Sequence, residues 1–324
     1  MDSLLDPKND WAFKQVFGEE KHKDILLEFL NDVLNDHVLH GNLITDVRFL
    51  KVNLDTEIIT LRQSIVDVLC KTSDGTYFIV EMQRASDSSF IQRAVEYASR
   101  VYLNQRRRDQ KEKNDKGGYN KLRPVIFLAI MEETLFPNKK AYLSHHQFRD
   151  VVTFEHDLKQ MSFSFLELSK FHKEFDELQD GIERWAYFFK NASYIDPRYL
   201  EEILEEDSAL SHAYKALERA YYSAEQLLEY DRYAWKEEEI QTRIDDARLE
   251  GEKAGEEKGR AEGIEQGRAE ERAKAEKELA EQKAKAEAKE TSTVKNLLKL
   301  GLSVEQIASA TGLTASEIDA IKIS

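Results

Sequence analysis

Two short apolar segments, residues 64–72 and 76–83, carry the side chains of this chain that are best suited to chemistry, namely Asp67, Glu81 and Gln83. Both segments are rich in β-branched and apolar residues, and the Ser-Asp-Gly sequence between them is typical of a turn. The pattern predicts a β-hairpin that holds two carboxylates and an amide inside otherwise apolar strands.

The length of the turn decides which of these side chains meet. With a three-residue loop in which Gly75 is left-handed, Asp67 lies directly opposite Glu81, and Gln83 shares their face because it is two residues further on. With a two-residue loop, Asp67 pairs with Met82 instead and Glu81 points to the other face. The first arrangement creates a site and the second does not.

A bound cation would explain why two carboxylates face each other in apolar strands. Like charges directly opposite in a sheet are destabilising, and burial of an unpaired carboxylate adds to that cost. Carboxylate oxygens favour Mg²⁺, with Ca²⁺ or Mn²⁺ as alternatives, and the eight scattered histidines offer no competing cluster. Two other interpretations stay open, in which the carboxylates face solvent at strand ends or pair with buried Lys or Arg.

The flanking sequence predicts the elements that position this hairpin. In chain order they are a helix over residues 22–35, a strand over 44–50, the two hairpin strands, a helix over 90–108 and a buried strand over 125–131. This order corresponds to a small α/β core with a mixed sheet. Further strands are predicted at 151–154 and 163–168, and the helix over 90–108 places on one side Ile91, Val95, Ala98, Val101 and Tyr102.

By composition the chain divides into four parts. Residues 1–170 form the core, and residues 171–235 predict a helical extension. Residues 236–290 consist mainly of Glu, Lys, Ala, Arg and Gly, with a glycine at every fourth position from Gly251 to Gly267, and predict a long charged helix or linker. It is either a solvated spacer or a close-approach surface that makes the protein a homo-oligomer through its tail.

Residues 291–324 regain an apolar pattern that predicts a small helix-turn-helix unit. Ser303 is suited to cap a helix over 304–311, and Gly312 begins a turn before a helix over 315–321. The second helix offers acidic residues, Glu317 and Asp319, where base-reading helices carry Arg, Lys, Asn or Gln. A structural or partner-binding cap and direct DNA reading both stay open.

The overall composition excludes some classes of protein. A net charge of −15 over 324 residues argues against coating nucleic acid through bulk charge, although a local basic groove is compatible with it. The single cysteine, Cys70, excludes an internal disulfide. With no signal-like N-terminus and no long apolar run, we expect a cytoplasmic protein that makes no membrane contact.

The hairpin belongs to an ordered set of motifs. Its own part is Ser64-Ile-Val-Asp67-Val, a gap, and Ile79-Val80-Glu81-Met82-Gln83. The other members are Asp10-Trp-Ala-Phe-Lys14-Gln-Val-Phe17-Gly, Phe29-Leu30-Asn31, Arg93…Tyr97…Tyr102, Tyr119…Leu122…Pro124-Val125-Ile126, Leu166-Glu167-Leu168-Ser-Lys170-Phe171, the tail glycines and Gly301-Leu-Ser303. Over nearly the full chain this set resembles the Rpn recombination-promoting nucleases, transposase-like members of the PD-(D/E)xK superfamily. Two positions depart from the superfamily pattern. Val66 replaces the usual proline, and Gln83 replaces the usual lysine, as is typical of this branch.

The resemblance implies a restriction-endonuclease-like fold and hydrolysis of DNA phosphodiester bonds. Asp67 and Glu81 would hold a divalent metal, and Gln83 would orient water by hydrogen bonding, because an amide does not act as a base at neutral pH. From the first helix, Asp10 is a candidate third acid and Lys14 a candidate cation. For these two the alternative is a surface ion pair at helical spacing.

Positive side chains that follow the motif are candidates for binding DNA phosphates. They are Arg93, Arg100, Arg106, Arg107 and Arg108. For the last three, a solvated helix end is an equal alternative. Lys71, on the strand of Asp67, is a further source of positive charge.

Taken together, these features predict a magnesium-dependent DNA endonuclease of low sequence specificity, linked to recombination or mobile DNA. Two alternatives remain open from the sequence. One is a non-catalytic protein that binds DNA or protein and assembles through its tail. The other is a nuclease that acts in defence against foreign DNA.

Overall fold

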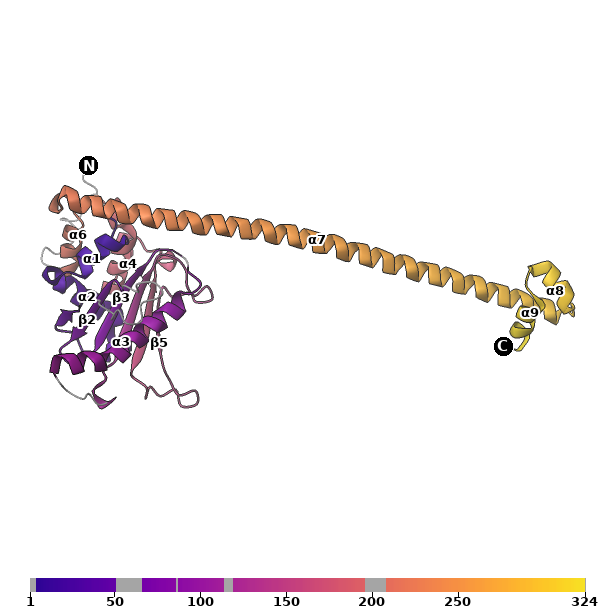
Figure 1. The fold of residues 1–324 in the computed structure, drawn as a ribbon, viewed down its shortest axis with the longest axis horizontal. Coiled ribbons are helices and arrows are strands. Elements are labelled where there is room, and N and C mark those ends of the chain that lie inside the picture. The colour runs from indigo at the N-terminus through magenta and orange to yellow at the C-terminus, as the bar shows by residue number, and fades with distance from the viewer. Residues whose placement is uncertain (1–3, 51–65, 86, 114–118, 196–207, 324) are drawn as a thin grey trace. The chain divides into compact units, whose positions relative to one another are not determined.

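A computed structural model describes residues 4–50, 66–85, 87–113, 119–195 and 208–323 of the chain (Figure 1). For residues 35–36, 106–113 and 323 it describes the backbone without the side chains. One compact unit comprises Met1–Thr242 and a second comprises Arg243–Ser324. None of the helices in these ranges is long and apolar enough to span a lipid bilayer.

The described strands of the first unit form one mixed, six-stranded sheet in the order β1-β2-β3-β4-β6-β5. The β3–β4 and β4–β6 pairs are parallel, and the other pairs are antiparallel. The strands are β1 (Val47–Phe49), β2 (Val68–Thr72), β3 (Tyr77–Gln83), β4 (Val125–Met131), β5 (Leu143–Gln147) and β6 (Met161–Glu167). This sheet, with its helices, confirms the predicted α/β core.

Helices cover both faces of this sheet (Figure 1). α3 (Phe90–Lys113) packs on one face through Phe90, Ala94, Tyr97, Ala98 and Val101. The other face is covered by α1 (Asp10–Phe17), α2 (Lys23–Leu34), α4 (Gly181–Asn191) and α6 (Ala209–Ala216). Since side chains alternate along β3, Tyr77 and Ile79 face α3 while Phe78 and Val80 face α1 and α2. β3 and β4 are therefore buried on both faces, as their apolar sequences predict.

α1 is short, and its start is fixed by its own sequence. The Asn9 side chain caps the helix by accepting hydrogen bonds from the backbone N–H groups of Trp11 and Ala12, at 3.0 and 3.3 Å. One side of α1 then buries Phe13 and Phe17 in the core. The opposite side, which carries Asp10 and Lys14, is left partly exposed.

The β2–β3 hairpin has the three-residue loop on which the predicted site depends. The Thr72 N–H donates to the Thr76 carbonyl at 3.0 Å, and Gly75 has φ +99°. The ladder pairs Val68 with Val80, so the same register places Asp67 opposite Glu81. The alternative register, with Asp67 opposite Met82, does not form.

Gly75 cannot be replaced by alanine without strain. Its positive φ disfavours any L side chain, and a Cβ there would lie 2.8 Å from Arg123 Cγ. We expect Gly75→Ala to lower the free energy of unfolding by about 1–2 kcal/mol in urea titrations. Gly259→Ala is the control, since its Cβ would meet nothing within 4 Å. Equal stability of both variants and wild type would contradict the assigned turn.

The predicted strand at 151–154 is wrong. Those residues form a tight turn between β5 and β6, in which Asp150 Oδ1 accepts hydrogen bonds from the Val152 and Thr153 N–H groups at 2.8 and 2.7 Å. Phe154 has φ +60°, which ends any extended conformation. The β-branched residues favoured a strand, but the capping aspartate decides the local structure. The sheet instead gains β5, whose polar sequence gave no strand signal.

The apolar side of α3 is only partly the predicted one, and Tyr102 packs against this core as predicted. Ala98 and Val101 are buried as predicted, but Ile91 and Val95 are 42% and 45% exposed. Phe90, Ala94 and Tyr97 take their place against the sheet. The buried side is set by Phe90, the first residue of the helix, which packs on Phe127 and Phe165.

In the second unit, α7 (Ala224–Lys299), which begins in the first unit, is followed by α8 (Val304–Thr311) and α9 (Ala315–Ile323). Ser303 and Gln306 form a capping box on α8, and Gly312 ends it with φ +80°. Val294, Ile307 and Ile318 form a small core there. The predicted helix-turn-helix is thus present. DNA reading by it and self-association through the glycines of α7 stay predictions.

Candidate metal centre

Asp67 and Glu81 meet at the carboxyl end of β3. Asp67 directly precedes β2, and its Oδ2 accepts a hydrogen bond from the Met82 backbone N–H at 2.9 Å. This bond turns the carboxylate towards β3, where Glu81 stands opposite. Glu81 donates a hydrogen bond to Asp67 when it is protonated. The hairpin therefore brings the two carboxyl groups into contact.

Glu81 is in an environment that opposes its charge. Burial raises the pKa of its carboxyl well above the usual value, and the neighbouring Asp67 charge and hydrogen bond act in the same direction. Lys14 and Arg93 lower the pKa but do not offset the first two causes. Its Oε1 is buried and has no hydrogen-bond partner among the described residues. Burial and the Asp67 charge thus both favour the protonated form of the Glu81 carboxyl.

Lys14 reaches this pair from α1. Its Nζ lies 3.0 Å from Asp67 Oδ1. Burial alone would lower the pKa of Lys14, but the charge and hydrogen bond of Asp67 outweigh it and the pKa is raised. Lys14 is thus a fixed positive charge beside the carboxylates, and its ion-pair partner is Asp67 rather than the Asp10 expected from helical spacing.

Asp10 lies near the pair without joining it. Its pKa is raised to about 6, first by burial, then by the charges of Asp67 and Glu237. Among the described residues, no group of three or more His, Cys, Asp or Glu is close enough to hold one ion together. Asp10 therefore acts on the centre electrostatically and does not complete a three-carboxylate cluster.

Gln83 is tied to Arg93 of α3. Its Oε1 accepts a hydrogen bond from Arg93 Nη2 at 3.0 Å, and its Nε2 donates to the Ala85 carbonyl at 2.8 Å. Arg93 also pairs with Asp87 at 3.0 Å and stands 5.3 Å from the Phe90 ring. The Arg93 Nε is buried without a partner among the described residues. The amide that replaces the usual lysine thus holds a guanidinium near Glu81.

Arg100 and Lys71, the other described positive side chains singled out in the sequence, have partners outside the centre. Arg100 pairs with Glu96 one turn away on the surface of α3. Lys71 lies over the Tyr77 ring, at 4.9 Å from its centroid, and the cations that act on Glu81 are Lys14 and Arg93. The side chains of Arg106, Arg107 and Arg108 lie outside the described residues.

An ionic network that the sequence did not indicate adjoins the centre. Arg84, directly after Gln83, pairs with Glu237 at 2.6 Å, Glu132 at 3.0 Å and Asp6 at 3.7 Å. Burial alone would lower the pKa of Arg84, but these three carboxylates raise it. Arg84 could have been suspected from its place beside the motif.

Glu237 connects α7 to the centre. Its Oε1 accepts a hydrogen bond from the Asp10 N–H at 3.1 Å, at the start of α1, where a negative charge is favourable. Two further residues of α7 act electrostatically on α1: Tyr233 contributes to the raised pKa of Lys14, and the charge of Lys236 acts to lower the pKa of Asp10. The first turns of α7, from Ala224 to Thr242, therefore belong to the surroundings of the carboxylate pair.

Comparison with known proteins identifies the family. A family model described as PD-(D/E)XK nuclease family transposase matches residues 7–247. The chain belongs to this family. Comparisons with curated proteins and with solved structures returned no significant match. Membership in the PD-(D/E)XK transposase family supports a nuclease-like function linked to mobile DNA, with DNA as the substrate. The matched range extends into α7, consistent with the contacts of Glu237.

PD-(D/E)XK nucleases generally use divalent metal ions, and this centre fits such an ion. The donors are carboxylate oxygens, and Glu81 Oε1 is a buried acceptor without a partner among the described residues. Magnesium is commonly bound through one or two carboxylates, with water and substrate phosphate filling its other positions. Two protein carboxylates therefore suffice as ligands.

Proposed function

We propose that the protein is a magnesium-dependent DNA endonuclease whose metal ligands are Asp67 and Glu81. The observation that carries this proposal is the contact between two carboxyl groups on neighbouring strands, one of them buried and with an unpartnered oxygen. Such a pair is costly in an apolar sheet unless a cation is bound. The family supports the reaction class, and the carboxylate pair supports this location for the metal ligands.

The roles of the nearby side chains follow from their contacts. A bound Mg²⁺ would lower the pKa of water and offset negative charge on the scissile phosphate. A metal ion bound by Asp67 would weaken the ion pair between Asp67 and Lys14. Lys14 could then bind a phosphate oxygen of the DNA. Gln83 uses one amide hydrogen on Ala85 and keeps a second with which it can orient water.

Arg93 supplies the positive charge that Gln83 lacks. Its Nη2 is fixed by Gln83 and Asp87, and its buried Nε has no hydrogen-bond partner among the described residues. Lys14 comes from α1 and Arg93 from α3, and the charges of both act on Glu81. These groups recognise phosphate and not bases, which supports low sequence specificity.

Plasmid nicking with purified full-length protein tests this proposal. We expect nicking with Mg²⁺ and none with EDTA. Asp67→Asn should reduce the rate by at least about 10²–10³-fold, because it removes a ligand and the partner of Lys14. Asp46→Asn is the matched control, since Asp46 is an exposed surface partner of Lys23, and it should cleave as wild type does.

Two results would count against a nuclease. One is the absence of metal-dependent nicking by folded wild-type protein. The other is an equal rate for Asp67→Asn and Asp46→Asn, which would place the activity elsewhere or in a contaminant. Retained DNA binding without cleavage would favour the non-catalytic alternative.

A further inference from the structure

Five of the eight histidines of the chain gather where the segment after α2 meets the β5–β6 hairpin. β5 is an edge strand, and β4 and β6 separate it from β3, which carries Glu81. Two of the histidines lie in η2 (Asn35–Leu39) and directly after it, and three lie on β5 and on the loop that follows. This histidine cluster consists of His37, His40, His145, His146 and His156.

Two pairs of histidine rings join the two segments. The rings of His37 and His145 are stacked, with centroids 5.4 Å apart and planes at 28°. The rings of His40 and His156 lie 6.1 Å apart. Beside the first pair, Gln147 Nε2 donates a hydrogen bond to the His37 carbonyl at 3.1 Å. In both ring contacts, one titratable group therefore faces another.

The surroundings of these rings favour the neutral imidazole. His145 Nδ1 lies 2.8 Å from Ser164 Oγ, and the pKa of His145 is lowered to about 4, first by burial and then by the charges of His37 and His146. Both ring nitrogens of His156 are buried without a hydrogen-bond partner among the described residues. A proton added to this ring would create a buried charge without an acceptor, which is costly.

Positive side chains add to this cost at His156. Burial is the first cause that lowers its pKa, and the charges of Arg149, His40 and Lys159 act in the same direction. The Leu158 backbone acts in the opposite direction but does not offset them. A protonated His156 would thus stand among other positive groups.

Carboxylates do not compensate for these charges. In the part of the chain that the structure describes, none of the five histidines forms an ion pair with a carboxylate. Asp150 and Glu155 bond to groups within their own loop. Glu167 acts to raise the pKa of His146, but burial and the Lys139 charge lower it overall. Protonated rings would therefore gain no ion pair in the closed structure.

We propose that the histidine cluster is an acid-sensitive contact that releases the β5–β6 hairpin from the segment after α2. At neutral pH the rings are uncharged and pack against each other. When the pH falls, protonation places like charges on rings that lie 5.4 and 6.1 Å apart, and their repulsion separates the two segments. Release requires neither a metal nor DNA, so it goes beyond the proposed nuclease activity and stands independently of it.

The pH range of this release follows from His145. Its pKa is about 4 in the folded protein and 6.5 ordinarily. Because the pKa is lowered, the contribution of His145 to the closed contact is fully present above pH 6.5 and is lost as the pH falls towards 4. Opening restores the ordinary pKa. At about pH 5 this difference corresponds to an open population about ten- to thirty-fold larger than at neutral pH.

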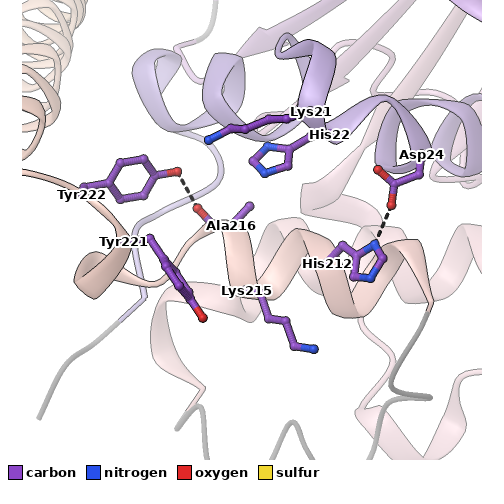
Figure 2. A pocket seen from close by; sticks show the side chains of 8 residues that line it. All are labelled: Lys21, His22, Asp24, His212, Lys215, Ala216, Tyr221 and Tyr222. Atoms are coloured by element: carbon purple, nitrogen blue, oxygen red, sulfur yellow. Dashed lines mark hydrogen bonds and ion pairs between the residues drawn. The ribbon is translucent and has the colours of Figure 1, made fainter.

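His212 and His22, outside the cluster, provide a contrast (Figure 2). His212 Nδ1 lies 2.5 Å from Asp24 Oδ2, so a proton on His212 strengthens this contact. His22 Nδ1 lies 2.8 Å from the Gln15 carbonyl, an acceptor that a protonated ring can still use. We therefore expect acid to leave the pocket that these histidines line closed.

Hydrogen–deuterium exchange of the full chain in EDTA, at about pH 7.5 and about pH 5, tests this proposal. Exchange times are scaled for the intrinsic pH dependence of amide exchange. We then expect the amides of residues 37–42 and 143–160 to exchange at least about ten-fold faster at the lower pH. The amides of β3 and β4, and those around His212, should exchange at the same scaled rate at both pH values.

Substitutions assign the effect to the rings. His145→Asn removes the titration and keeps an amide that can bond to Ser164, so it should reduce the acid acceleration by at least about five-fold. Addition of His156→Asn should abolish it. His172→Asn is the matched control, because His172 is an exposed histidine outside the cluster, and it should behave as wild type does. Each variant is compared with itself at the two pH values, so a loss of stability common to both leaves the test valid.

Three outcomes would overturn the proposal. The first is scaled exchange of residues 37–42 and 143–160 that is the same at both pH values. The second is equal acid acceleration in wild type and in the His145→Asn, His156→Asn double variant. The third is acceleration of equal size in β3 and β4, which would mean general acid unfolding. None of these results would bear on metal-dependent nicking, which the centre at Asp67 and Glu81 accounts for separately.

Discussion

Glu81→Gln is expected to abolish metal-dependent nicking and, in the absence of metal, to make the protein more stable. The substitution removes a metal ligand, so the rate should fall by at least about 10³-fold. It also replaces a buried acid by a neutral group of the same shape, whose amide can hydrogen-bond to Asp67. Loss of function with gain of stability is the pattern of a residue kept for its chemistry.

The gain in stability of Glu81→Gln over wild type should depend on pH. The pKa of Glu81 is raised in the folded protein by burial and by Asp67, above its ordinary value of 4.5. The contribution of Glu81 to the free energy of unfolding is therefore fully present below pH 4.5. It is lost as the pH rises through the pKa of Glu81 in the folded protein. Glu81→Gln has no such loss, so its advantage over wild type should grow from acid to neutral pH.

Urea unfolding in EDTA between about pH 5 and pH 8 measures this difference. We expect the free energy of unfolding of Glu81→Gln to exceed that of wild type by about 1–3 kcal/mol near pH 8, and by less near pH 5. Glu96→Gln is the control, because Glu96 is a half-exposed surface partner of Arg100 and should show no such trend. A constant difference across this range would contradict a buried, protonated Glu81.

The part of the site that could be predicted from sequence is the part that local geometry determines. A Ser-Asp-Gly loop with left-handed Gly75 sets the register, and the register alone brings Asp67 to Glu81. Strand alternation then puts Gln83 on the same face. These steps need only a turn type and a period of two, which are properties of a few consecutive residues.

The rest of the site depends on tertiary contacts that no local pattern encodes. Arg84 and Glu237 lie 153 positions apart in the chain. Glu237 is the first of three consecutive glutamates in a highly charged segment, so the sequence does not distinguish it from the other two. Likewise, Lys14 lies one helical turn from Asp10, so spacing favoured that pair, but packing of α1 on the sheet gives it Asp67. Polar β5 is a strand because β6 offers it an edge.

Arg84→Met is expected to lower the free energy of unfolding by about 2–3 kcal/mol, since breaking a buried ion pair costs about 3–5 kcal/mol and an exposed one below about 1 kcal/mol. Arg84 lies between these limits, because its side chain is 34% exposed and faces three carboxylates. Methionine preserves much of the apolar stem, so the loss reports the charge. Thermal and urea unfolding of the full chain measure it.

Two further variants assign this loss to the contact between β3 and α7. Arg100→Met breaks a surface pair and should change stability by less than about 0.5 kcal/mol. Glu237→Gln in the Arg84→Met background should restore part of the loss, because it removes one of the carboxylates left without a cation. If Arg84→Met lowers the free energy of unfolding no more than Arg100→Met does, the Arg84 network contributes no more to stability than a surface ion pair. If the rescue is seen and nicking is also reduced by Arg84→Met, the beginning of the charged helix is part of the nuclease core, because Glu237 then holds the α1 start that carries Asp10 and Lys14.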